Sequence, residues 1–135
     1  MDPSTINWLG VVAASVLAFV LGGIWYARSL FGRIWQRESG LSDEQIAGAN
    51  MGKTFGVAFV WTFAGAFVFA MFLGPDPEAS LAIFAGVMAG LFWVAGSLAI
   101  NYQFEQRSMK LWLINGGYHT VQYTLYGAVL GLWPG

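Results

Sequence analysis

The stretch LWLINGGYHTVQYTLYGAVLGLWPG, residues 111–135, runs for 25 residues without one charged side chain. Three further charge-free runs precede it, at residues 3–27, 54–75 and 79–104. The hydrocarbon core of a bilayer is about 30 Å thick, and a helix that rises about 1.5 Å per residue needs about 20 apolar residues to cross it. Each of the four runs is therefore long enough for one transmembrane helix.

The composition agrees with a membrane location. Of the 135 residues, 57% are hydrophobic and only 10% are charged, against about 25% charged in an ordinary soluble domain. Six Lys and Arg with seven Asp and Glu cannot cover the surface of a water-soluble protein of this size, which excludes a soluble globular enzyme. A net charge of −1 provides no basic surface for a nucleic-acid partner.

We predict an all-α membrane protein in which four transmembrane helices form one bundle. The runs lack the alternation of transmembrane strands, and a segment in lipid must satisfy its own backbone hydrogen bonds. The helices are expected near residues 7–28, 54–73, 79–103 and 110–132. No linker separates them, so residues 1–135 are expected to form a single transmembrane domain.

The basic residues predict the orientation. Four of the six lie between the first two predicted helices and two lie between the last two, while the N-terminal segment, the 74–78 turn and the C-terminal segment have none. Under the positive-inside rule both basic loops face the cytoplasm and both termini lie outside. We therefore expect a multi-pass protein of the bacterial cytoplasmic (inner) membrane. The first run lacks a preceding basic segment, which argues against a cleaved signal peptide.

The first long loop contains an amphipathic pattern. Phe31, Ile34 and Trp35 share one helical face and have arginines beside them, which predicts a short cytoplasmic interfacial helix near residues 30–39. Gly40 is expected to end this helix.

A capping box follows in the same loop. Ser42 is expected as the N-cap and Gln45 as its partner three residues later. The pattern predicts a helix that begins near Asp43, outside the membrane, and continues through the second span to Leu73. The sequence PDPE at residues 75–78 is expected to form a tight turn that no helix crosses.

Every predicted span carries a stripe of small residues spaced about four apart. The stripes consist of Gly10, Ala14, Ala18 and Gly22; Ala58, Thr62, Ala66 and Ala70; Ala82, Gly86 and Gly90; and Gly116, Thr120, Thr124 and Ala128. Helices associate in lipid through close backbone approach and interhelical hydrogen bonds. The stripes serve either packing inside one bundle or contacts between copies in a homo-oligomer.

The last span also carries a polar face. Asn115, His119, Gln122 and Tyr126 fall within about 60° of one another at the helical angle per residue, and Tyr118 and Tyr123 flank them. Polar groups inside a membrane are costly and normally face the bundle interior or a cavity.

The third span ends in polar residues at a similar depth. Together the two helices predict a candidate polar cluster or ligand site of Asn101, Tyr102, Glu105, Asn115, Tyr118, His119, Gln122 and Tyr126, with Glu105 at its cytoplasmic mouth. One interpretation is a small-molecule or proton site in which His119 titrates. The other is that these groups hydrogen-bond to one another and fix helix register.

Other kinds of site lack their residues. None of the four runs contains Asp, Glu, Lys or Arg, and one histidine without cysteine cannot form a zinc or bis-histidine haem site. Glycine-rich phosphate loops and nucleophile elbows are absent as well. We predict no catalytic residues, no metal and no cofactor, and therefore no enzyme.

Several motifs carry a family resemblance. The two most specific run from Asn101-Tyr102 through Phe104-Glu105 to Arg107-Ser108, and from Ile114-Asn115 to Tyr118-His119. Over essentially its whole length the chain resembles the bacterial family catalogued as domain of unknown function 1761, uncharacterised four-span membrane proteins. The resemblance implies the same architecture and no established activity.

Two functions follow as hypotheses. The first is a non-enzymatic helical bundle, surrounded by the lipid bilayer, that acts as a homo-oligomer or as an accessory subunit beside other membrane proteins. The alternative is a protein that binds or transports a small-molecule or lipid-like ligand at the polar cluster around His119.

Overall fold

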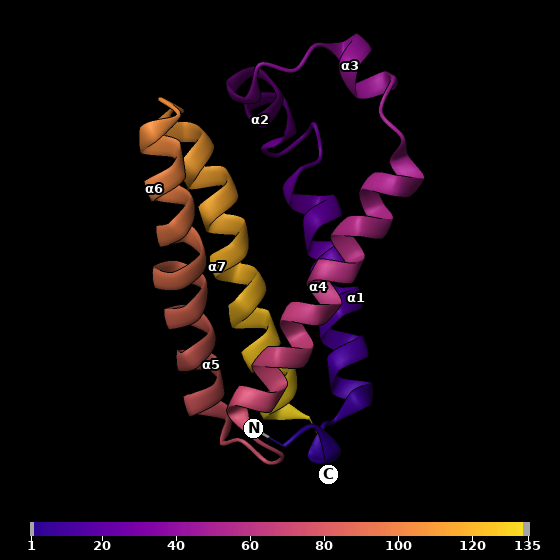
Figure 1. Ribbon diagram of the computed structural model, residues 1–135, viewed down its shortest axis with the longest axis vertical. Coiled ribbons are helices and arrows are strands. Elements are labelled where there is room, and N and C mark those ends of the chain that lie inside the picture. The colour runs from indigo at the N-terminus through magenta and orange to yellow at the C-terminus, as the bar shows by residue number, and fades with distance from the viewer. Residues whose placement is uncertain (1, 134–135) are drawn as a thin grey trace.

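The computed structural model describes residues 2–133, and these residues form helices joined by turns, with no strand among them (Figure 1). This confirms the predicted all-α class. In chain order the elements are η1 (Pro3–Thr5), α1 (Trp8–Trp25), α2 (Gly32–Ser39), α3 (Asp43–Ala47), α4 (Met51–Leu73), α5 (Ala79–Met88), η2 (Ala89–Ala95), α6 (Gly96–Phe104) and α7 (Met109–Leu132).

Three helical segments in the described part of the chain are long and apolar enough to cross a membrane. They are Trp8–Trp25, Met51–Leu73 and Ala79–Phe104, the last of which combines α5, η2 and α6. Their outer faces carry large apolar side chains such as Trp61, which is 73% exposed. Lipid is the surrounding in which such faces are stable.

Helix α7 occupies the centre of the structure. It is 24 residues long, but its polar side chains keep it less apolar than the other three segments. It contacts α1, α2, α4, α5, η2 and α6. Because α7 faces protein on so many sides, it can carry polar residues that a lipid-facing helix could not.

The third segment and α7 pack backbone against backbone. A Cβ atom added at Gly86 would lie 2.2 Å from the carbonyl oxygen of Tyr123, and one added at Gly127 would lie 2.1 Å from that of Ala82. Only glycine permits this approach. The small-residue stripes on these two helices therefore serve packing inside the chain.

The third segment is interrupted by a π-helix. Residues Ala89–Ala95 form η2, in which backbone hydrogen bonds reach five residues instead of four. The indole Nε1 of Trp112 donates to the carbonyl oxygen of Ala95 at 2.8 Å and ties this irregular turn to α7. The expectation of one regular helix over 79–103 therefore holds for its extent but not for its interior.

The predicted amphipathic helix is present as α2. It ends at Gly40, whose φ of 74° lies in the left-handed region that favours glycine. The rings of Trp25 and Phe31 pack 5.0 Å apart, centre to centre, and those of Tyr26 and Trp35 lie 5.9 Å apart. These contacts fold α2 back onto the end of α1.

The capping box is confirmed, but the helix that it starts is short. The side chains of Ser42 and Gln45 each accept a hydrogen bond from the other residue's backbone N–H. Helix α3 then stops at Ala47, and α4 begins with Asn50 as its N-cap. The predicted continuous helix from Asp43 to Leu73 is wrong, because Gly48 and Asn50 favour helix ends over helix interiors.

Candidate functional site

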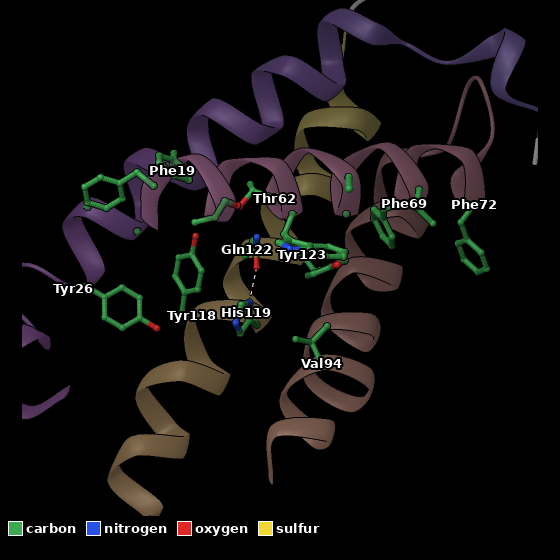
Figure 2. Close-up of a pocket in the computed structure, with 18 residues that line it drawn as sticks. Phe19, Tyr26, Thr62, Phe69, Phe72, Val94, Tyr118, His119, Gln122 and Tyr123 are labelled. Carbon is green, nitrogen blue, oxygen red and sulfur yellow. Dashed lines mark hydrogen bonds between the residues drawn. The ribbon is translucent and has the colours of Figure 1, made fainter. Parts of the chain in front are cut away.

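A cleft of about 1210 Å³ lies between α4 and α7, with α1 and η2 completing its walls (Figure 2). Most of its surface is apolar, and phenylalanines line both of its ends: Phe19 lies at one end, with Phe55 packed against it, and Phe69 and Phe72 lie at the other. Among the described residues that line it, none is Asp, Glu, Lys or Arg. The cleft is therefore uncharged and mainly hydrophobic, with a few polar groups.

Helix α7 supplies most of the polar side chains of the cleft, and two of them, His119 and Gln122, belong to a chain of hydrogen bonds that we call the His119 relay. His119 Nδ1 lies 2.7 Å from Gln122 Oε1, and Gln122 Nε2 lies 2.7 Å from the hydroxyl of Tyr126. The Tyr126 hydroxyl donates in turn to the backbone carbonyl oxygen of Thr62 on α4 at 2.9 Å. The relay thus connects the cleft to α4 through a buried tyrosine.

A second polar network lies nearer the α2 end. Asn115 accepts a hydrogen bond from the Tyr26 hydroxyl at 2.7 Å and donates to the Tyr102 hydroxyl at 2.8 Å. One amide thereby joins α1, α6 and α7. This network has no bond to the His119 relay among residues 2–133 and acts as a helix clamp.

Aromatic donors add further bonds between helices. The Tyr118 hydroxyl donates to the carbonyl oxygen of Ala18 at 2.9 Å, and the Trp25 indole donates to that of Ile114 at 2.9 Å. Both bonds join α1 to α7. They hold in place the wall of the cleft opposite α4.

The predicted cluster is therefore divided. His119, Gln122 and Tyr126 form the relay, Asn115 and Tyr102 belong to the clamp, and Tyr118 lines the cleft between them. Gln122 and Tyr126 are buried, and the other four residues are half-buried.

Two predicted members lie elsewhere. Asn101 is exposed and makes no side-chain hydrogen bond within the described chain, and Glu105 pairs with Arg107 at 3.4 Å. Neither lines the cleft. The structure does not bring them together with the other members: Asn101 is an exposed residue of α6, and Glu105 is the exposed residue that caps the end of α6.

Tyr123 is a cleft residue that the predicted site omits. It lies four residues after His119, lines the cleft, and its hydroxyl makes no hydrogen bond to residues 2–133. Its i, i+4 spacing from His119 places it on the same side of α7, and this spacing could have predicted that it joins the site. A Cβ added at Gly65 would lie 3.0 Å from this hydroxyl, so the glycine makes room for the ring.

Three of the arginines gather at the α2 end, outside the three long apolar segments. Arg28, Arg33, Gln36, Arg37 and Asp43 line a smaller hollow of about 410 Å³ with Leu41. The hydrogen bond from Gln36 and the charge of Arg28 hold the pKa of Asp43 below its usual value. Within the described chain no group of three acidic or histidine side chains could hold a metal ion.

Comparison with known proteins adds a family and nothing on activity. A family model described as "Protein of unknown function (DUF1761)" matches residues 9–131. No curated protein and no solved structure matches the chain.

Proposed function

The chain belongs to the DUF1761 family, of unknown function, and from its own side chains we propose that it is a membrane protein that binds a neutral, lipid-like molecule in the cleft. The membership confirms the resemblance found in the motifs. The observation that carries the proposal is an apolar cleft of about 1210 Å³ whose described lining is uncharged and includes His119 and Tyr123. Apolar pockets with a few convergent polar groups are the usual form of small-molecule sites.

The chemistry of the lining selects the ligand. A charged ligand inside a membrane needs a counter-charge or many hydrogen bonds, and the cleft provides no opposite charge among its described residues. A molecule with an apolar body and one small polar group fits both the aromatic rings and the polar side chains of His119 and Tyr123. This supports a binding role over a catalytic one.

We also propose that the chain crosses the membrane four times, with α7 as the fourth span. The first turn of α1 and the last turn of α7 lie at one end of the bundle, whereas α2, α3 and the α6–α7 turn lie at the other (Figure 1). All six Lys and Arg belong to that second end, which would face the cytoplasm. The polar side chains of α7 face other helices, which supports its place inside a lipid-embedded bundle.

Labelling tests this orientation directly, because the chain has no cysteine. Single cysteines at Ser4 or Asp76 should react with a membrane-impermeant maleimide in intact cells. Cysteines at Glu44 or Glu105 should react only after lysis. Reaction of Ser4→Cys and Glu44→Cys under the same condition would overturn the four-span arrangement.

The homo-oligomer or accessory subunit, which is the leading hypothesis from the sequence, takes second place here. Its motivation was the small-residue stripe on every span, and the stripes of α5 and α7 are accounted for by contacts inside the chain. No side chain of the described residues fills the cleft, so we favour ligand binding. The mass of the purified protein in detergent tests the oligomer: a multiple of the mass of one chain would support it, and the mass of one chain would contradict it.

A blocked cleft tests the binding proposal. Gly23 lines the cleft and a Cβ added there would meet nothing within 4 Å, so Gly23→Leu should project into open space without disturbing packing. Gly56→Leu is the matched control, because its Cβ also meets nothing within 4 Å but it does not line the cleft. Native mass spectrometry of protein released from nanodiscs should find a retained lipid-like molecule on the wild type and on Gly56→Leu, but not on Gly23→Leu. Equal retention by the two variants would contradict the proposal.

A further inference from the structure

The polar atom that His119 presents to the cleft has a definite hydrogen-bonding character. On the basis of the proposed function, we infer that the ligand donates a hydrogen bond to His119 Nε2. The ligand is then a neutral lipid with a free hydroxyl group, and not an ether or ester that lacks a donor. The inference rests on the direction of the His119 relay.

The direction of the hydrogen bonds in the relay is fixed at the Thr62 end, by a group that can only accept a hydrogen bond. The backbone carbonyl oxygen of Thr62 has no proton, so the Tyr126 hydroxyl must donate its single hydrogen to it. The Tyr126 oxygen is then left to accept from its other neighbour, Gln122. The atom of Gln122 that faces Tyr126 must therefore be the amide nitrogen.

The orientation of Gln122 then decides the tautomer of His119. With its nitrogen toward Tyr126, Gln122 turns its carbonyl oxygen toward His119, and that oxygen can only accept. His119 Nδ1 must carry the proton. In the neutral imidazole the other nitrogen, Nε2, is consequently unprotonated and acts as an acceptor.

Nothing in the described chain satisfies this acceptor. His119 lines the cleft, and Nε2 makes no hydrogen bond to residues 2–133. No acidic side chain lines the cleft to balance an imidazolium, which favours the neutral ring. A ligand without a donor would leave Nε2 unpaired when it displaces water from the cleft, and such a loss is costly.

The neighbouring polar group is compatible with a hydroxyl. The Tyr123 hydroxyl also lines the cleft and is not bonded within the described chain. A ligand hydroxyl can donate to His119 and accept from Tyr123, whereas an ether oxygen can only accept. The remaining hydroxyls of the lining already donate within the protein: Tyr26 to Asn115, Tyr118 to Ala18 and Thr62 to Ala58.

The test compares dodecanol with dodecyl methyl ether, in which a methyl group replaces the hydroxyl hydrogen and removes the donor. Both are titrated into nanodiscs that contain wild-type protein or His119→Phe, and occupancy is read by native mass spectrometry. The two probes partition differently into lipid, but that difference is the same for both proteins. The alcohol-to-ether preference of the wild type divided by that of His119→Phe therefore isolates the contribution of Nε2.

We expect this ratio to be about tenfold, the effect of one buried hydrogen bond left unmade. Tyr126→Phe provides a second variant that keeps the imidazole. It frees Gln122 to turn over and His119 to change tautomer, so the preference for the alcohol should fall although the ring is intact. This variant also serves if His119→Phe does not fold.

The outcomes separate the two proposals. If both probes bind to the wild type and neither His119→Phe nor Tyr126→Phe changes the preference, the inferred donor is wrong while the cleft remains a binding site. If neither probe binds above the level of Gly23→Leu, the proposed function itself fails and the inference fails with it. A preference that falls in both substituted proteins supports the inferred donor.

Discussion

Adding a single methyl group at Gly86 tests how tightly α5 and α7 are joined. The Cβ of Gly86→Ala would lie 2.2 Å from the carbonyl oxygen of Tyr123, and 2.8 Å from its carbonyl carbon. Comfortable contacts between such atoms begin more than 3 Å apart. Since both obstacles are backbone atoms, no side-chain rotation can relieve the clash, and the two helices must separate by about 1 Å.

The expected cost follows from the size of this displacement. Overpacking of a well-packed interior costs about 1–3 kcal/mol, and a backbone clash belongs at the upper end. Replacing glycine by alanine inside a helix returns about 1 kcal/mol. We therefore expect Gly86→Ala to lower the free energy of unfolding by about 2 kcal/mol.

Gly56→Ala is the matched control. A Cβ at Gly56 would meet nothing within 4 Å, so only the helix-propensity term remains and stability should rise by up to about 1 kcal/mol. Denaturation of the two variants in mixed detergent micelles, followed by circular dichroism, should separate them by about 3 kcal/mol. Equal midpoints would refute the close approach of α5 and α7.

Two further predictions concern the clamp and the charged end. Asn115→Ala should lower the free energy of unfolding by about 1–3 kcal/mol in the same denaturation assay, because two hydrogen bonds are lost. Asn101→Ala should change it by less than about 0.5 kcal/mol. Equal effects would contradict the finding that Asn115 joins helices and Asn101 does not. The lowered pKa of Asp43 means that its bonds from Gln36 and Arg28 stabilise the fold above the ordinary carboxyl pKa and are lost as the pH falls through the lowered one. Asp43→Asn should therefore expose the α2–α3 turn to limited proteolysis at neutral pH, as acid does in the wild type, and unchanged cleavage would contradict this role.

Much of the fold follows from the sequence because charge and capping are local signals. The charge-free runs predict all four long helices to within a few residues, and Gly40 and Ser42 act as the predicted caps. The break at Gly48 also has a local signal, in Gly48 and Asn50, which the prediction of one continuous helix did not weigh. The π-helix at Ala89–Ala95 does not follow, because it depends on competition between nearly equal backbone hydrogen-bonding patterns, which tertiary contacts such as that of Trp112 decide.

The candidate site shows the difference between depth and direction. Depth follows from counting residues along a helix, so Asn101, Tyr102 and Asn115 are correctly expected at one level. Direction depends on how each helix is turned about its own axis. One residue is a turn of about 100°, which places Tyr102 against Asn115 and leaves Asn101 exposed. The role of the Thr62 carbonyl oxygen as acceptor for Tyr126 cannot be predicted from the sequence, because every residue has such an oxygen.

The backbone contact between α5 and α7 has a consequence for how the molecule can move. Two helices that touch carbonyl to glycine cannot slide or part without a large cost, so they behave as one rigid body. Within residues 2–133, no glycine contact of this kind joins α4 to α7, and one side-chain hydrogen bond, from Tyr126 to Thr62, connects them. We therefore expect any change in the width of the cleft to come from movement of α4, not from movement within the α5–α7 pair.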